Sequence, residues 1–305
     1  MTRVLVTGAS GFIGRALLPV LRARGFEVHG CGRGAAPSGL PAIAAWHTAD
    51  LLTERGRAQV MAAARPSHLV HLAWEARPGR YRDHPDNTAW IAASLDLLEQ
   101  ARATGTGRIV GIGTCFEYGP SAVPCREDVT PCRPTTLYGQ AKLAAAEGFV
   151  AAATRGAGVA WARVFFPFGE GEAEGRLIPS LIRSLRAGEV FNCSLGTQVR
   201  DFIHVGDLAQ AIAAVLDSDV TGVVNLGAGE PRTLRSVVEF FAHRLDAEHL
   251  VAFGAREVSG VDSEPVIVAD IARLQATGWR PTIGFEAGAM RTLAWWQERL
   301  SSGTS

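Results

Sequence analysis

The chain has 305 residues, of which 47% are hydrophobic and 20% are charged. This composition is typical of a folded globular protein and argues against long disordered segments. The 30 basic and 30 acidic residues cancel, so the charge balance predicts no nucleic acid and no anionic membrane as a partner. The apolar runs are too short to span a bilayer. The five cysteines show no CxxC spacing, which predicts no metal site and favours a reducing, cytoplasmic location.

Short apolar runs alternate with helical patterns along the chain. The run at residues 4–8 predicts a strand, and the spacing of Ile13, Leu17 and Leu21 predicts a helix over 12–24. Strand–helix alternation with continuous apolar strands is the pattern of an α/β fold with a Rossmann-type, doubly wound parallel sheet. The other predicted strands lie at 27–31, 43–46, 68–73, 108–113, 160–166 and 223–227, and the other predicted helices at about 86–104, 136–155, 207–217, 233–245 and 285–300.

The alternation weakens in the second half of the chain. We expect residues 1–166 to form a dinucleotide-binding domain, to which residues 202–227 return. Residues 167–201 and 228–305 are expected to form a smaller C-terminal α/β lobe that binds the substrate. A ligand site is expected past the carboxyl ends of the strands, between the sheet and this lobe.

A glycine-rich turn follows the first predicted strand. In the segment Gly8-Ala-Ser-Gly11-Phe-Ile-Gly14, Gly8 allows the tight turn and Gly14 allows the helix to pack close to the sheet. Gly11 lets a pyrophosphate approach the backbone at the helix N-terminus, where free N–H groups and the helix dipole favour anions. The position between a strand and a helix predicts a dinucleotide site.

The end of the second predicted strand indicates which dinucleotide is bound. An acidic residue there would bind the adenosine ribose and favour NAD(H). Gly32 stands at that position and Arg33 follows it. A guanidinium without a neighbouring carboxylate suits a 2′-phosphate and favours NADP(H), unless Arg33 only stacks on the adenine. Asp50, after the third predicted strand, is expected either to contact the adenine or to act as a turn residue.

The only lysine of the chain, Lys142, follows one of its three tyrosines, Tyr138, by four residues. This spacing places both side chains on one face of a helix. A phenol of ordinary pKa near 10 is a poor base at neutral pH, and a nearby ammonium lowers that pKa by stabilising the phenolate. Thr114, at the end of the fifth predicted strand, adds a hydroxyl that is expected to bind the same substrate oxygen.

Several segments together resemble the extended short-chain dehydrogenase/reductases, the group of nucleotide-sugar epimerases, dehydratases and reductases. The resemblance covers nearly the whole chain. It rests on TGASGFIG (7–14), HLAW (71–74), TCFEYG (114–119), Tyr138-xxx-Lys142, RDFIHV (200–205), FGARE (253–257) and GWRP (278–281).

The resemblance implies a role for each candidate site residue. The catalytic residues would be Thr114, Tyr138 and Lys142. The cofactor would be bound by Gly8, Ser10, Gly11, Phe12, Ile13, Gly14, Arg33, Asp50, Leu51, Leu72, Ala73, Tyr138 and Lys142. The substrate would be bound by Trp74, Thr114, Arg200 and Arg256, the two arginines holding its phosphates.

Departures from the family pattern narrow the predicted chemistry. Nucleotide-sugar 4,6-dehydratases have Asp-Glu directly after the catalytic Thr, whereas this chain has Cys115-Phe116. Glu117 is expected to be structural or solvated rather than an unusual acid or base. Phe166 stands where many epimerases have Asn. The C-terminal half looks similar to nucleotide-sugar 4-ketoreductases of the CDP-abequose synthase type.

These features predict an NADPH-dependent reductase of a nucleotide-linked 4-keto hexose, which is either a 6-deoxy sugar or not. The principal alternative is a nucleotide-sugar 4-epimerase that recycles a bound NAD. An atypical dehydratase and a non-catalytic dinucleotide-binding sensor are further alternatives. The resemblance also implies a homodimer, formed through the predicted helices at 86–104 and 136–155.

Overall fold

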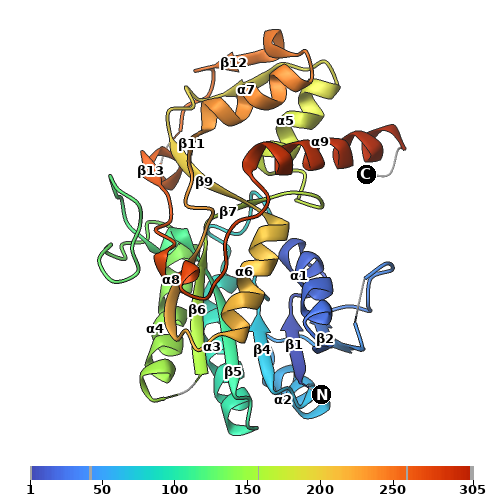
Figure 1. Cartoon of the computed structure of the whole chain (residues 1–305), viewed down its shortest axis with the longest axis vertical. Helices are drawn as coiled ribbons and strands as arrows, with labels where there is room; N and C mark the ends of the chain where they lie inside the picture. The colour runs from blue at the N-terminus through green and yellow to red at the C-terminus, as the bar shows by residue number, and fades with distance from the viewer. Residues whose placement is uncertain (1, 41–42, 157, 259, 303–305) are drawn as a thin grey trace.

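The computed structural model describes residues 2–40, 43–156, 158–258 and 260–302 (Figure 1). Its centre is a 7-stranded sheet with the order β10-β6-β5-β4-β1-β2-β3, and every neighbouring pair in it is parallel. The predicted Rossmann-type fold is therefore confirmed. The strands are β1 (Arg3–Thr7), β2 (Glu27–Gly32), β3 (Ala45–Thr48), β4 (His68–His71), β5 (Arg108–Thr114), β6 (Gly158–Val164) and β10 (Gly222–Leu226).

Helices cover both faces of this sheet because alternate strand residues point to opposite faces. Val4 and Val6 of β1 pack in one core cluster and Leu5 packs in another. The first cluster includes residues of α1 (Phe12–Ala23) and α6 (Val205–Asp217). The second includes residues of α2 (Glu54–Ala64), α3 (Asp86–Ala103) and α4 (Leu137–Thr154).

A smaller lobe lies beyond one end of the central sheet, at the top of Figure 1. Its strands form a 4-stranded sheet and a 2-stranded sheet, and a separate apolar cluster forms its core. Its strands are β7 (Phe166–Phe168), β8 (Phe191–Cys193), β9 (Val199–His204), β11 (Pro231–Thr233), β12 (Val251–Phe253) and β13 (Val266–Ile267), and its helices are α5 (Leu177–Arg186), α7 (Leu234–Arg244) and α9 (Phe285–Ser301). The remaining short helices are η1 (Cys115–Glu117), η2 (Glu248–Leu250), η3 (Gly260–Ser263) and α8 (Ala272–Gln275).

Some element predictions were wrong. The predicted strand at 43–46 lies at Ala45–Thr48, and β4 ends at His71 instead of reaching residue 73. Helices α2 and α5 were not predicted. Pro179 lies within the first turn of α5, where a proline is tolerated because the backbone N–H would have no helical partner. The outer domain limits at residues 1 and 305 lie outside the described residues.

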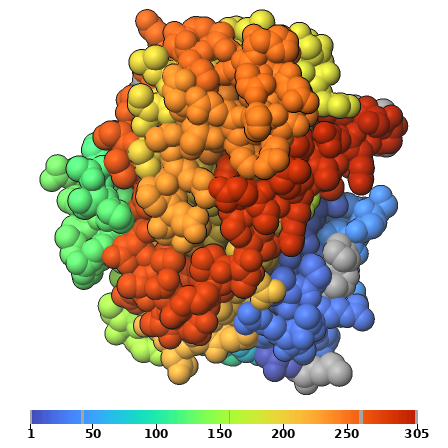
Figure 2. Space-filling view, turned by 45° about the horizontal axis from the view of Figure 1, so that its top comes forward, coloured from blue at the N-terminus to red at the C-terminus, as the bar shows by residue number. Residues whose placement is uncertain are grey.

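The C-terminal chain covers much of one face of the molecule. Figure 2 shows these residues in orange to red, with the N-terminal residues in blue at one side. Among the described residues, none of the helices combines the length and the apolar character that crossing a bilayer requires.

Candidate active site

One large cavity connects the glycine turn with the lobe. Its volume is about 960 Å³, at the upper end of the range for ligand pockets. Gly8 and Gly11 line one end, Tyr138 lines the middle, and Phe202 and Arg256 line the other end. The cavity therefore lies past the carboxyl ends of the strands, between the sheet and the lobe, where the sequence predicts a ligand site.

The glycine turn has the geometry of a phosphate cradle. Gly8 has a φ of +68°, and a Cβ there would lie 2.9 Å from the backbone nitrogen of Ala73. A Cβ on Gly14 would lie 2.5 Å from the carbonyl oxygen of Gly8. Gly11 is the N-cap residue of α1, so the free N–H groups of the helix start face the turn. Ser10, Phe12, Ile13, Leu51, Leu72 and Ala73 also line the cavity.

The end of β2 has no room for an acidic side chain. A Cβ on Gly32 would lie 2.7 Å from the ring of Trp46, whose Nε1 donates to the Gly34 carbonyl at 2.9 Å. Arg33 is exposed and lines the cavity. The Asp50 side chain accepts a hydrogen bond from the Leu52 backbone N–H at 3.0 Å. That contact is the turn role, which was one of the two expectations for Asp50.

Thr114 and Tyr138 meet at the middle of the cavity. Thr114 ends β5 and caps η1, and Tyr138 lies in the first turn of α4, where its backbone N–H donates to the Arg82 carbonyl at 2.9 Å. Burial raises the pKa of Tyr138, while hydrogen bonding to Thr114 and the charge of Arg176 lower it. The phenol therefore carries its proton at neutral pH. The Tyr81 ring packs edge-on against it, with centroids 4.9 Å apart.

Lys142 lies about one helical turn after Tyr138 on α4, and its side chain is only 4% exposed. Its Nζ donates to the Ile112 carbonyl at 2.6 Å and lies 3.8 Å from the ring centroid of Trp74. Burial lowers the pKa of Lys142 to about 7, and the charge of Glu117 acts in the opposite direction. Lys142 therefore loses its proton more readily than an exposed lysine does.

Arg200 and Arg256 both line the lobe end of the cavity, but their surroundings differ. Arg200 is 3% exposed. Its guanidinium donates to the carbonyls of Val199, Asp262 and Glu264 at 2.8–3.0 Å. Arg256 is exposed. The predicted phosphate-binding pair thus consists of one arginine held by backbone and one facing solvent.

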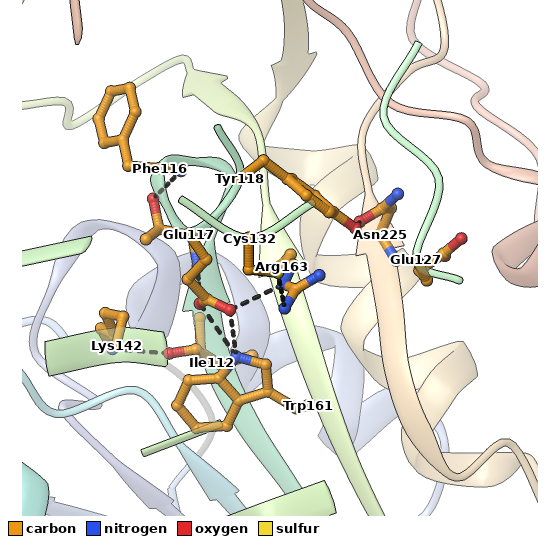
Figure 3. Close-up of polar contacts among 11 residues, drawn as sticks. Ile112, Phe116, Glu117, Tyr118, Glu127, Cys132, Lys142, Trp161, Arg163 and Asn225 are labelled. Carbon is orange, nitrogen blue, oxygen red and sulfur yellow. Dashed lines mark hydrogen bonds and ion pairs between the residues drawn. The ribbon is translucent and has the colours of Figure 1, made fainter. Parts of the chain in front are cut away.

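The residues that depart from the family pattern occupy apolar or structural positions. Cys115 is 3% exposed, and burial raises the pKa of its thiol, so neither Cys115 nor Phe116 supplies an acid or base. Phe166 packs against Phe116 and Phe202 with centroids 5.8 and 6.0 Å apart. Glu117 is 0% exposed and pairs with Arg163 at 2.7 Å (Figure 3). Its expected structural role is the one the contacts support.

Tyr81, Glu172 and Arg176 are among the cavity residues that were not predicted, whereas the resemblance left Arg82 either facing the substrate or solvated on the surface. Arg82 forms a bidentate ion pair with Asp262 at 2.8 and 2.6 Å, and Tyr81 and Arg176 pack next to each other. Glu172 has a buried Oε2 atom without a hydrogen-bond partner among the described residues, and burial raises the pKa of this carboxyl to about 8. The sequence signal for Glu172 and Arg176 was only their charge in a loop after a predicted strand, which surface loops commonly share.

No group of three or more His, Cys, Asp or Glu side chains within the described ranges is arranged to hold a metal ion. At the glycine turn, the absence of Cβ atoms leaves open space next to the start of α1. The residues present therefore fit a dinucleotide at this end of the cavity.

Known proteins resemble the chain over most of its length. The NAD dependent epimerase/dehydratase family matches residues 4–227. The chain is 30% identical to a UDP-glucose 4-epimerase of Corynebacterium glutamicum, with 92% of this chain and 91% of that protein covered. It is 32% identical to a dTDP-6-deoxy-L-talose 4-dehydrogenase (NAD(P)(+)) of Kitasatospora kifunensis, with coverage of 78% and 77%. The structure of MoeE5 in complex with UDP-glucose and NAD is similar with a TM-score of 0.82, an identity of 30% and coverage of 98% and 99%.

Proposed function

Because the chain belongs to the NAD dependent epimerase/dehydratase family, we propose that it is an NADPH-dependent reductase of a nucleotide-linked 4-keto-6-deoxyhexose. The observation that carries this proposal is the convergence of Thr114, Tyr138 and Lys142 on a cavity that also contains Gly8 and Arg256. The similarity to a dTDP-6-deoxy-L-talose 4-dehydrogenase supports the same chemistry in the opposite direction.

The glycine-turn end would hold the cofactor. The N–H groups at the start of α1 would bind the pyrophosphate, and Arg33 would bind a 2′-phosphate. The missing carboxylate at Gly32 supports NADPH over NADH. When bound, NADPH supplies the hydride that reduces the C4 carbonyl.

The side chains in the middle of the cavity would handle the proton. Tyr138 would give its phenolic proton to the C4 oxygen as that oxygen gains negative charge, and the Thr114 hydroxyl would donate to the same oxygen. The raised pKa of Tyr138 supports this direction, since a protonated phenol is the proton donor that reduction needs. Lys142 would stabilise the resulting phenolate until solvent returns the proton.

The test is turnover with a panel of nucleoside-diphosphate 4-keto-6-deoxyhexoses and NADPH. Loss of NADPH absorbance and NMR of the product would report reduction at C4. Tyr138→Phe should lower kcat by at least about 100-fold and change the Kd for NADPH far less, because the ring is retained and only the hydroxyl is lost. Wild-type turnover by Tyr138→Phe would overturn the assignment of the proton donor.

A nucleotide-sugar 4-epimerase is the second candidate. It is favoured by the 30% identity to a UDP-glucose 4-epimerase, and it would use the same three side chains. The discriminating measurement is the dinucleotide released when freshly purified protein is denatured. Tightly held NAD⁺ in stoichiometric amount would favour the epimerase, whereas an empty protein that binds NADPH far better than NADH would favour the reductase.

The less favoured alternatives have their own tests. An atypical dehydratase would need an acid and a base near the sugar, and the buried Cys115 and the apolar Phe116 argue against it. A sensor would bind the dinucleotide without turnover of any keto sugar. The homodimer through α3 and α4 and the cytoplasmic location stay predictions, and light scattering of the purified chain would test the first.

A further inference from the structure

We propose that Glu117 is a positioning residue of the active site. Its carboxylate is bonded to the edge of the Trp161 indole, whose ring Lys142 also approaches, and it fixes the backbone of Thr114. It thereby places a buried negative charge near the Lys142 ammonium. The inference about catalysis rests on the proposed function, whereas the inference about the charge of Lys142 does not.

The Glu117 carboxylate is enclosed by donors from two neighbouring strands, β5 and β6. It accepts hydrogen bonds from the Thr114 backbone N–H at 2.9 Å, from Trp161 Nε1 at 3.0 and 3.1 Å and from Arg163 Nε at 2.7 Å. The residue before Thr114 is Gly113, and a Cβ there would collide with both Glu117 Oε1 and Trp161 Nε1. The glycine is therefore needed for the carboxylate to reach its place beneath the catalytic hydroxyl.

Lys142 and the Glu117 carboxylate both lie next to the indole of Trp161. Its Nζ lies 5.7 Å from the Trp161 ring centroid, and the N–H of the same ring donates to Glu117. Within the described part of the chain, no acidic side chain forms an ion pair with Lys142 at 4.0 Å or less. Its charge is thus supported by the Ile112 carbonyl, by the faces of Trp74 and Trp161, and by Glu117 at longer range.

The other titratable groups around Lys142 do not replace Glu117. His71 on β4 is buried, and burial together with the charge of Lys142 lowers the pKa of that imidazole to about 3, so it stays neutral. Tyr138, on the same helix, also stays neutral because burial raises its pKa. Glu117 is therefore the negative charge that opposes the desolvation of Lys142.

Arg163 pairs with Glu117 but does not shield it from Lys142. Figure 3 shows Arg163 and Lys142 on opposite sides of the carboxylate. A buried carboxylate without a partner would be costly, and Arg163 offsets that cost from the side away from the cavity. The pair thus allows a buried negative charge to act on Lys142.

The single lysine makes a direct test possible. Protein labelled only with ¹⁵N-lysine has one lysine side chain to observe, and an NMR titration of that signal reports the pKa of Lys142 alone. Glu117→Gln keeps an acceptor for Trp161 but removes the charge, so we expect the titration midpoint of Lys142 to fall by about one pH unit. Glu127→Gln is the matched control, because Glu127 is a nearby carboxylate that contacts Asn225 and lies on the Arg163 side of the network (Figure 3).

Kinetic measurements separate the effect of the Glu117 charge from the effect of the position of its carboxylate. In Glu117→Gln the alkaline limb of the kcat/KM profile, which reports the free enzyme, should move to lower pH together with the NMR midpoint. Glu117→Asp keeps the charge but is too short to reach the Thr114 N–H, so its alkaline limb should stay in place while kcat falls. A purely structural role would lower kcat in both variants without moving either limb.

An unchanged Lys142 midpoint in folded Glu117→Gln would overturn the proposal. If that variant does not fold, Glu117→Gln/Arg163→Met removes both buried charges. A smaller downward shift is then expected, because losing the positive charge on the far side of the carboxylate offsets only part of the effect. An unchanged midpoint there would also overturn it. A shifted midpoint in a protein whose wild type reduces no keto sugar would refute the proposed function and leave the inference about Lys142 intact.

Discussion

The glycine-turn end of the cavity, formed by Gly8, Gly11 and Gly14, is built from backbone, whereas the lobe end, around Phe166, Arg200 and Arg256, is built from side chains. At the first end the absence of Cβ atoms makes the space. At the second end the space depends on how residues far apart in the chain pack, as when Arg200 donates to carbonyls in the 262–264 segment. The difference suggests that one end binds a common ligand part and the other sets specificity.

Gly14→Ala is expected to disrupt the glycine-turn end more than any other substitution considered below. The added Cβ would meet the carbonyl oxygens of Gly8 and Ala9 at 2.5 and 2.7 Å, and these backbone atoms cannot move without shifting the turn. We expect a loss of about 2–3 kcal/mol in the free energy of unfolding and at least about 100-fold weaker dinucleotide binding. Urea unfolding and calorimetric titration measure both. Gly284→Ala is the control, since nothing lies within 4 Å of a Cβ there, and an equal loss in the control would contradict the steric account.

Substituting Arg200 and substituting Arg256, the two arginines of the lobe end, should affect stability and substrate binding differently. Arg200→Ala leaves three backbone carbonyls without their donor, so the free energy of unfolding should fall by about 2 kcal/mol. Arg256→Ala removes an exposed side chain and should change that quantity by less than about 0.5 kcal/mol, while raising KM for the nucleotide sugar about tenfold. Thermal unfolding measures the change in stability of each variant, and steady-state kinetics measure the change in KM. Equal loss of stability in both variants would refute the distinction.

Arg33→Ala tests which dinucleotide the glycine-turn end prefers. The exposed guanidinium is expected to contact only a 2′-phosphate, so the Kd for NADPH should rise about tenfold and the Kd for NADH should stay the same. Fluorescence titration with each dinucleotide measures this. A parallel loss for both would favour the alternative in which Arg33 stacks on the adenine, and no loss for either would remove Arg33 from the site.

Glu172→Gln is expected to give the smallest effect. Burial raises the pKa of Glu172 from its ordinary 4.5 to about 8, so between these values the folded chain holds one proton more than the unfolded chain. The stability of the wild type should therefore fall as the pH rises from about 5 to 8. The variant should be flatter over this range by about 1 kcal/mol, a value that allows for partial solvent screening. Urea unfolding at a series of pH values measures the slope, and identical slopes would place the carboxyl in a more solvated setting.

Local motifs explain what could be predicted at the site. The turn from Gly8 to Gly14 depends on residues a few positions apart, and helical periodicity alone places Tyr138 and Lys142 on one face. The alternation of apolar strands and helices predicts the parallel sheet for the same reason, because each period is a local property. Helices α7 and α9 of the lobe were predicted from the same periodicity, whereas α5, which carries Pro179 in its first turn, was missed.

The sequence by itself determined the sheet, the glycine turn and the Thr114, Tyr138 and Lys142 set, since each depends on neighbouring residues or on a short repeat. The tertiary structure alone decided the burial of Glu117 against Arg163, 46 residues away, and the pairing of Arg82 with Asp262, 180 residues away. It also decided that Arg200 is held by backbone and that Trp46 fills the space beside Gly32. The charge state and reach of a side chain depend on the groups packed around it, and distant segments supply those groups.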